Sequence, residues 1–153
     1  MRFLDFLHIR RRKIKSEFWG TMTLVRFNKR LNESYFECSR YFTPTDNNIE
    51  IRINVDQSGV TEKSISFFKQ IEEQYLEICK SATPFIEWLF KEMKEDITIV
   101  DFQKEFQATR LYLPKCESAP VVWEMTFAIV LEAEKRQFTI LMEDFEAQDI
   151  GMD

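Results

Sequence analysis

The sequence predicts an α+β domain with a mainly antiparallel sheet, in the order strands, helices, strands, and with two helices packed on one face of the sheet. Three observations predict it. Residues 49–56 alternate between apolar and polar without a fault. Apolar residues recur at helical spacing between Ile65 and Met93. Strand-like segments occur in groups before and after that helical region, and grouped elements are typical of α+β domains.

Strands are expected first. Residues 18–27 and 35–42 are rich in aromatic and β-branched side chains, and polar turns at 28–34 and 44–48 separate the segments. In residues 49–56 every odd position is apolar and every even position is polar, which predicts a half-buried strand. Three successive strands with short turns indicate an antiparallel meander.

Two helices are expected next. Thr61 is a suitable N-cap for the first helix. Its apolar face would hold Ile65, Phe68, Ile71, Tyr75, Ile78 and Cys79. Thr83-Pro84 would begin the second helix, because proline is favoured at the first helical position. We therefore expect a break near Ser81–Thr83. The apolar face of the second helix would hold Phe85, Ile86, Leu89, Phe90 and Met93.

Three aromatic side chains on these helices admit two interpretations. Phe67 and Phe68 are adjacent, so they cannot both point squarely into one core, and Trp88 lies at the margin of its apolar face. Such residues are either exposed anchors for a protein partner or parts of a wide, two-sided core helix. Both interpretations stay open at the level of sequence.

The region after the helices returns to strands. Residues 97–106 fit a short helix or a strand, 108–113 look extended, and 115–120 form a loop. Further strands are predicted at 121–131, 137–142 and 147–152. In residues 121–131 the odd positions are large and apolar and the even positions are smaller.

Charge divides the chain into two parts. Residues 1–15 carry six Arg or Lys and one Asp, a net charge of +5, whereas the whole chain carries −5, so residues 16–153 carry −10. We predict a basic, flexible leader at 1–15 and a single domain at 16–153. The leader lacks the order of a signal peptide, and no apolar run is long enough to cross a membrane. The chain is expected to be cytoplasmic.

The sequence offers few residues for catalysis or cofactors. His8 is the only histidine and lies in the leader, and no glycine-rich phosphate motif is present. Cys38, Cys79 and Cys116 are far apart, which favours reduced thiols over a disulfide framework or a zinc site. We predict no catalytic residue, no cofactor and no metal, hence no enzyme. The basic run from Arg10 to Lys15 is either a solvated tail or a surface for phosphates, membranes or a partner.

Several motifs resemble a family. A group of small bacterial proteins of unknown function, often encoded beside toxin genes of contact-dependent or type VI secretion systems, is similar to this chain over residues 16–153. The segments that carry the resemblance are Phe18 to Met22, Ile49 to Val55, Asp56 to Thr61, Trp123-Glu124, Phe138 to Ile140 and Ile150 to Asp153. Members of the group look like immunity proteins, which bind and neutralise a toxin.

The resemblance implies a cytoplasmic, non-catalytic protein that captures a cognate toxin. An acidic body repels nucleic acid and favours a basic partner, so acidic residues become the candidates for contact. They are Glu72, Glu73 and Glu77 on the first helical region, and Glu143, Asp144, Glu146 and Asp149 near the carboxyl end. Two alternatives remain: a self-associating scaffold protein such as a homodimer, or a small-ligand binder with a dispersed carboxylate site.

Overall fold

A single sheet of eight strands forms the frame of the protein. The computed structural model describes residues 12–25, 34–54 and 60–152. Four strands precede the helices and four follow them. The strands are β1 (Lys13–Ser16), β2 (Gly20–Val25), β3 (Tyr35–Phe42), β4 (Asn47–Asn54), β5 (Phe106–Leu113), β6 (Val122–Ile129), β7 (Gln137–Glu143) and β8 (Glu146–Met152). The helices are α1 (Glu62–Glu73), α2 (Tyr75–Glu92) and α3 (Phe102–Glu105). The expected class is confirmed.

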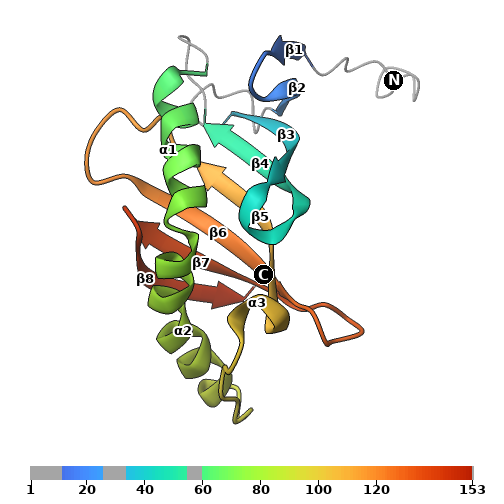
Figure 1. Ribbon diagram of the computed structural model, residues 1–153, viewed down its shortest axis with the longest axis vertical. Helices are drawn as coiled ribbons and strands as arrows, with labels where there is room; N and C mark the ends of the chain where they lie inside the picture. The colour runs from blue at the N-terminus through green and yellow to red at the C-terminus, as the bar shows by residue number, and fades with distance from the viewer. Residues whose placement is uncertain (1–11, 26–33, 55–59, 153) are drawn as a thin grey trace, which may run out of the picture.

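The strands lie side by side in the order in which they follow one another along the chain, from β1 at one edge to β8 at the other (Figure 1). Neighbours are antiparallel except β4 and β5, which are parallel. A parallel pair needs a long crossover connection, and α1 and α2 occupy that connection. The meander expected for the first strands is confirmed, and the parallel pair in the middle of the sheet was not predicted.

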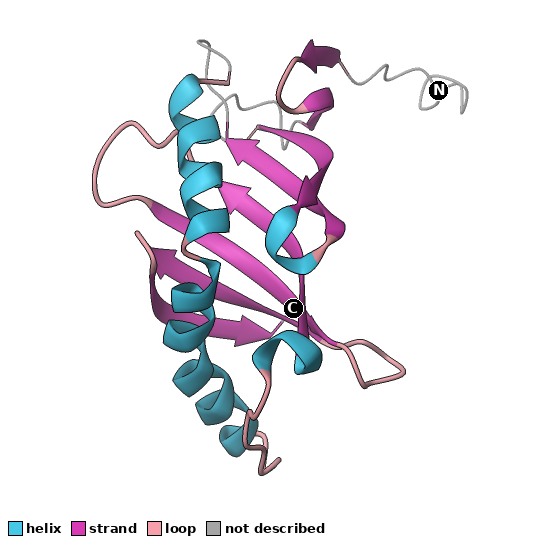
Figure 2. Cartoon of the chain, in the orientation of Figure 1, coloured by secondary structure: helices cyan, strands magenta, loops and turns pink. Residues whose placement is uncertain are grey.

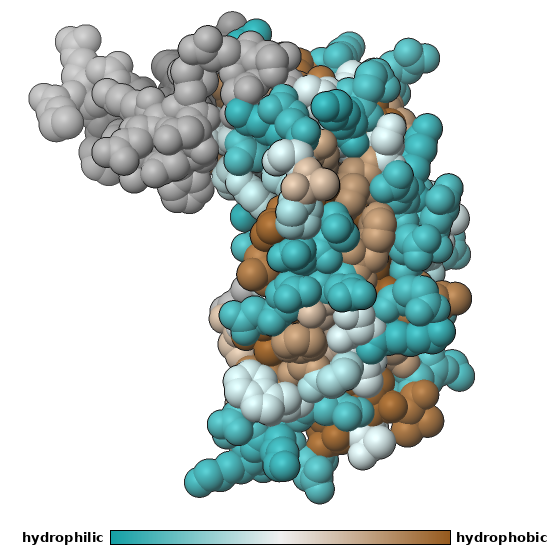
Figure 3. All heavy atoms as spheres, turned by 90° about the vertical axis from the view of Figure 1, so that its left-hand side faces the viewer, coloured by the Kyte–Doolittle hydropathy of each residue, from teal (hydrophilic) through white to brown (hydrophobic). Residues whose placement is uncertain are grey.

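The helices cover one face of the sheet, and the core lies between the two layers (Figure 2). Ile49, Ile51 and Ile53 on β4 are buried against the helices, whereas Glu50 and Arg52 point to the other face. Trp123, Met125 and Phe127 do the same on β6. The alternation in residues 49–56 therefore predicts the faces of β4 correctly, and in β6 the large odd positions are the ones that lie in the core. Seen from the side, apolar atoms run in a band between polar surfaces (Figure 3).

The boundary between the helices differs from the expectation. α1 ends at Glu73 and α2 begins at Tyr75, so the break falls at Gln74 and not near Ser81–Thr83. Pro84 lies inside α2. Proline removes one backbone donor, and the Thr83 hydroxyl donates to the Cys79 carbonyl oxygen at 2.8 Å within the same turn. The buried residues Tyr75, Ile78 and Ala82 hold α2 against the sheet through this turn.

Of the three aromatic side chains on the helices whose orientation was open, two are buried and one is exposed. Phe67 and Phe68 are both buried, at 6% and 0% exposure, so the two-sided core helix is the correct interpretation for them. Phe68 meets Trp19 and Phe42 edge to face, and Phe67 packs edge to face on Trp123. Trp88, in contrast, is 53% exposed. The side chain at the margin of the apolar face is therefore the one that reaches solvent.

The structure also defines three further features: residues 97–106, the N-cap of α1 and the basic run. Residues 97–101 form no regular element, α3 follows, and β5 starts at Phe106. Thr61 stands at the N-cap of α1 as predicted, but its hydroxyl donates to the Lys115 carbonyl oxygen at 3.4 Å and not to the helix. Lys13 and Lys15 of the basic run lie in β1. His8, Arg10, Arg11 and residues 28–33 of the first predicted turn lie outside the described residues.

Candidate functional site

A hollow of about 700 Å³ lies on the face of the sheet that the helices do not cover. We call it the open-face hollow. Two rows of residues, each in register across neighbouring strands, form most of it. One row is Arg110, Thr126, Thr139 and Gly151, and the other is Arg52, Tyr112, Glu124, Leu141 and Asp149. The hollow therefore crosses the sheet from β4 to β8.

The depth of the hollow follows from residue size. Thr126, Thr139 and Gly151 form the floor on β6, β7 and β8, while arginine and tyrosine side chains stand on β4 and β5. A Cβ atom added at Gly151 would meet no heavy atom within 4 Å. Small residues between larger ones thus leave space on a face that the helices do not cover.

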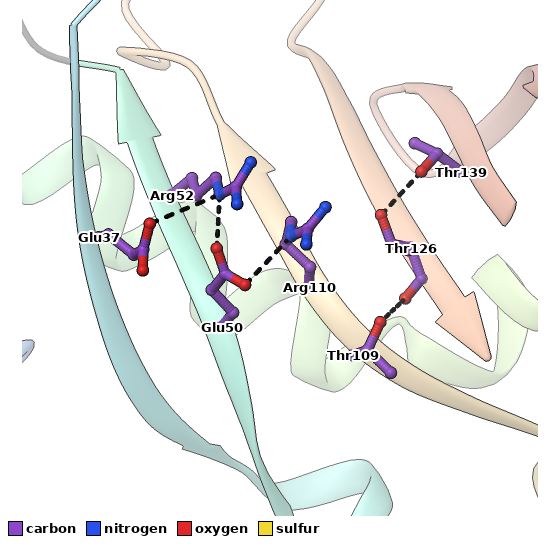
Figure 4. Close-up of polar contacts among 7 residues, drawn as sticks. All are labelled: Glu37, Glu50, Arg52, Thr109, Arg110, Thr126 and Thr139. Atoms are coloured by element: carbon purple, nitrogen blue, oxygen red, sulfur yellow. Dashed lines mark hydrogen bonds and ion pairs between the residues drawn. The ribbon is translucent and has the colours of Figure 1, made fainter. Parts of the chain in front are cut away.

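Glu50 organises the arginine end of the hollow. Its two carboxylate oxygens accept hydrogen bonds from Arg52 Nε at 2.5 Å and from Arg110 Nε at 3.3 Å. Glu37 on β3 lies 3.9 Å from Arg52 Nε. Figure 4 shows both guanidinium groups extending from neighbouring strands on this face. One carboxylate therefore fixes two cations side by side, which would repel each other without it.

The terminal nitrogens of the two arginines remain available. Glu50 occupies only their Nε atoms, and within the described residues no hydrogen bond is made by the other guanidinium nitrogens of Arg52 or Arg110. Each of these side chains is 29% exposed. An arginine fork of this kind suits a carboxylate or phosphate, because two parallel N–H donors match two acceptor oxygens.

Tyr112 lines the hollow beside Arg52 and packs against Tyr35. The Arg52 guanidinium lies 5.1 Å from the centre of the Tyr35 ring, and Tyr35 meets Tyr112 edge to face at 6.4 Å. Burial, together with the negative charge of Glu124, raises the pKa of Tyr112 above its ordinary value. Tyr112 is therefore a neutral phenol at physiological pH, able to donate and accept hydrogen bonds.

A hydroxyl ladder lines the floor next to the arginines. Thr126 and Thr139 share a hydrogen bond between their Oγ1 atoms at 2.8 Å (Figure 4). Thr109 occupies an irregularity in the β5–β6 register, between Ala108 and Arg110, and donates to the Thr126 carbonyl oxygen at 3.3 Å. An extra residue in one strand of an antiparallel pair changes the direction in which the following side chains point. Here it affects Arg110 and Tyr112.

The middle and the far end of the hollow each carry one carboxylate. Glu124 lies on β6, opposite Tyr112, and Asp149 lies on β8. Both are exposed, and neither forms an ion pair with any described residue. Asp149 Oδ1 accepts the backbone N–H of Ile150 at 2.8 Å. The open-face hollow thus carries two cations at the β4–β5 end, one anion in the middle and one anion at the β8 end.

The acidic residues singled out from the sequence fall into three places. Asp149 lines the hollow. Glu143, Asp144 and Glu146 surround the turn between β7 and β8, where Asp144 accepts the N–H groups of Val121 and, through its carbonyl oxygen, of the Trp123 indole. The three acidic residues on the helices lie elsewhere. The Glu72 carboxylate accepts a hydrogen bond from the Thr43 backbone N–H at 2.9 Å. Glu77 forms an ion pair with Lys80 at 2.7 Å, and Glu73 is exposed.

Sequence reasoning missed the arginines and threonines of the hollow. The even positions of residues 49–56 and the smaller even face of residues 121–131 were the available signal, because both mark a face turned away from the core. What the periodicity cannot show is which strands pair. Arg110 comes to lie opposite Glu50 only through the parallel β4–β5 register.

The described residues contain no group of three or more His, Cys, Asp or Glu side chains placed to hold a metal ion. No helix in the described part of the chain is long and apolar enough to cross a membrane. Comparison of the chain with protein-family models, with curated proteins and with solved structures found no match.

Proposed function

We propose that the protein is a non-catalytic binding module that captures a protein partner on the helix-free face of its sheet. The observation that carries the proposal is the open-face hollow, where charged side chains are held in place by Glu50 while the terminal nitrogens of Arg52 and Arg110 make no hydrogen bond to a described residue. Ordered charges lose little entropy on binding, so they favour recognition of a matching surface.

Within this class, the proposed role is that of a cytoplasmic immunity protein that neutralises a bacterial toxin. The resemblance of the sequence motifs supports this role, and so does the net charge of −10 on residues 16–153, derived from −5 for the chain and +5 for residues 1–15. An acidic body accelerates the capture of a basic partner. Glu143, Asp144 and Glu146 would contribute to this attraction beside the hollow residue Asp149.

A substitution that fills the hollow tests the proposal. Gly151→Trp places a large side chain where no heavy atom lies within 4 Å of the added Cβ. Gln148→Trp is the matched control, because Gln148 is exposed on the same strand but does not line the hollow. The tagged wild-type protein is used to isolate a partner from its own cells. A toxin identified in this way is then expressed together with each variant.

The wild-type chain and Gln148→Trp should bind the toxin and restore growth, whereas Gly151→Trp should do neither. Equal protection by all three chains would show that the hollow is not the binding surface. The absence of any protection by the wild-type chain would remove the immunity role.

Self-association is a second candidate, and one observation favours it. A groove of about 340 Å³, lined by Pro84, Phe85, Trp88 and Asp149, lies where α2 runs beside the edge strand β8. Exposed aromatics and edge strands are common in contacts between chains. Light scattering of the wild-type chain and of Trp88→Ser over a range of concentrations separates the candidates, because a wild-type monomer at all concentrations excludes a homodimer.

A further inference from the structure

The open-face hollow is divided by charge along its length. In the residue row Arg52, Tyr112, Glu124, Leu141 and Asp149, each member is the register partner of the next. Four strand spacings separate β4 from β8, which amounts to roughly 19 Å at about 4.8 Å per spacing. The cation Arg52 stands at one end of this row, with Arg110 beside it in the neighbouring row, while Glu124 stands in the middle and Asp149 at the other end.

We propose that the hollow recognises a polypeptide segment that carries a carboxylate at one end and a cationic side chain at the other. Arg52 and Arg110 would hold the carboxylate, and Asp149 would hold the cation, while Glu124 lies between the two ends. This inference rests on the proposed protein-binding function and adds the chemistry of the bound segment.

The arginine end is built for a carboxylate. Glu50 takes the Nε atom of each arginine and leaves the edge formed by the two terminal nitrogens. A carboxylate can accept two parallel hydrogen bonds from such an edge. The floor continues from this point over the small residues Thr126, Thr139 and Gly151, so the backbone of the bound segment would lie over a surface without bulky side chains.

The acidic side chains of the hollow select for a cation. Glu124 and Asp149 are exposed and form no ion pair with the described residues. A segment with acidic groups only would meet repulsion there, and a segment with basic groups only would meet it at Arg52 and Arg110. A segment of mixed charge satisfies both ends. Extended chain advances about 3.4 Å per residue, so about six residues span the row.

Synthetic peptides of six residues test the inference on the full-length protein. The probe has blocked ends, one Glu at one terminus, one Arg at the other, and Ser and Thr between them, and it is made in both chain directions. Two control peptides replace the Glu or the Arg by Ser. Dissociation constants come from NMR titration of the nitrogen-15 labelled protein, followed at the Gly151 amide and the Arg110 Nε–H.

The mixed-charge peptide should shift both signals, in at least one chain direction, and should bind about tenfold more tightly than either control, because each lost charge-assisted contact weakens binding by about that factor. Similar affinities for all peptides would overturn the inference. So would the absence of measurable binding at millimolar peptide.

Variants identify the two ends separately. Arg110→Gln should weaken binding of the mixed-charge peptide about tenfold and leave binding of the control without Glu unchanged. Asp149→Asn should show the reciprocal pattern. Gly151→Trp should abolish binding and Gln148→Trp should retain it. Thermal unfolding of each variant checks that the fold survives, and the comparison of peptides on the wild-type chain stands without any variant.

The experiments distinguish failure of the mixed-charge assignment from failure of the proposed protein-binding function. Toxin capture that is lost in Gly151→Trp, with no preference for mixed-charge peptides, would leave the protein-binding function intact and remove the charge assignment. Preference for the mixed-charge peptides without toxin protection would keep the hollow as a peptide site and remove the immunity role.

Discussion

Arg136 donates hydrogen bonds from its two terminal nitrogens to the two carboxylate oxygens of Glu95, at 2.7 and 2.8 Å. This pair of hydrogen bonds joins the turn before β7 to the segment that follows α2, 41 residues away in the sequence. Arg136 Nε also donates to Glu132 at 2.8 Å. The contact ties the crossover helices to the carboxyl-terminal half of the sheet.

The first prediction concerns the pH dependence of this contact. Hydrogen bonds from Arg136 lower the pKa of Glu95 and of Glu132 below their ordinary values. A lowered pKa in the folded state contributes stability above the pKa of the unfolded state, near 4.3 for Glu. That stability is lost as pH falls through the folded pKa. Arg136→Gln should therefore lower the urea midpoint at pH 7, and the difference from wild type should shrink at acidic pH.

The control for this measurement is Lys135→Gln, which removes the same charge from the same turn and has no ion pair to a described residue. Lys135→Gln should change the urea midpoint little at either pH. A difference between Arg136→Gln and wild type that stays constant from pH 7 to pH 3 would contradict the prediction.

The second prediction concerns Pro84. It stands inside α2, where it provides no backbone donor, and it is exposed. Pro84→Ala restores a hydrogen bond within the helix and should raise the free energy of unfolding by about 1–2 kcal/mol, below the full helix-interior penalty of about 3 kcal/mol, because the more flexible unfolded chain offsets part of the gain. Urea unfolding followed by circular dichroism measures the change.

Ser66→Ala, at an exposed position of α1, is the matched control and should change the free energy of unfolding by less than about 0.5 kcal/mol. A loss of stability in Pro84→Ala would mean that the proline ring makes contacts more valuable than the missing hydrogen bond.

The third prediction concerns the hydroxyl of Tyr75. The side chain is 1% exposed, and its hydroxyl makes no hydrogen bond of regular geometry to a described residue, although the Cys79 thiol interacts with it. The thiol of Cys79, one turn further along α2, is only a weak hydrogen-bonding group. A buried polar atom without a partner costs about 1–3 kcal/mol. Tyr75→Phe should therefore leave the free energy of unfolding unchanged or raise it by about 1 kcal/mol.

Tyr75→Ala provides the contrast, because it removes the ring that meets Phe42 edge to face and should cost about 3–5 kcal/mol. A loss above about 1 kcal/mol in Tyr75→Phe would show that the hydroxyl has a real partner.

The fourth prediction concerns the thiols. Burial raises the pKa of Cys38 to about 11 and that of Cys79 to about 12. Burial also raises the pKa of Cys116 to about 11. Because the thiolate is the reactive form, labelling with a thiol reagent at pH 8 should be slow in the folded protein and fast in denaturant.

The same shifts predict loss of stability in alkali. A folded pKa above the unfolded value, near 8.5 for Cys, gives stability that is complete below that value and declines as pH rises toward the folded pKa. The urea midpoint should therefore fall between pH 8 and pH 11. Rapid labelling of the folded protein at pH 8 would contradict the prediction.

Local periodicity determined much of the fold. The alternation in residues 49–56 placed Ile49, Ile51 and Ile53 in the core, and helical spacing identified α1 and α2. Both patterns depend only on where successive side chains point, so one sequence is enough to read them. The same patterns placed Trp88 at the margin of its helix, where the structure leaves it half exposed.

Tertiary packing decided the rest. The break between α1 and α2 falls at Gln74 and not near Ser81–Thr83, because the buried face of α2 stays in contact with the sheet through Pro84. The site residue Asp149 was predicted as part of an acidic edge, yet it faces a hollow that arginines from β4 and β5 also line. No run of residues around Asp149 reveals those distant partners.

The chain by itself therefore determined which residues face the core and which face solvent, because side-chain direction is a local property of helix and strand geometry. Only the tertiary structure decided that Arg110 stands beside Glu50, sixty residues earlier. That contact depends on how α1 and α2 carry the chain from β4 to a parallel β5, and the register of a crossover is set by packing between layers.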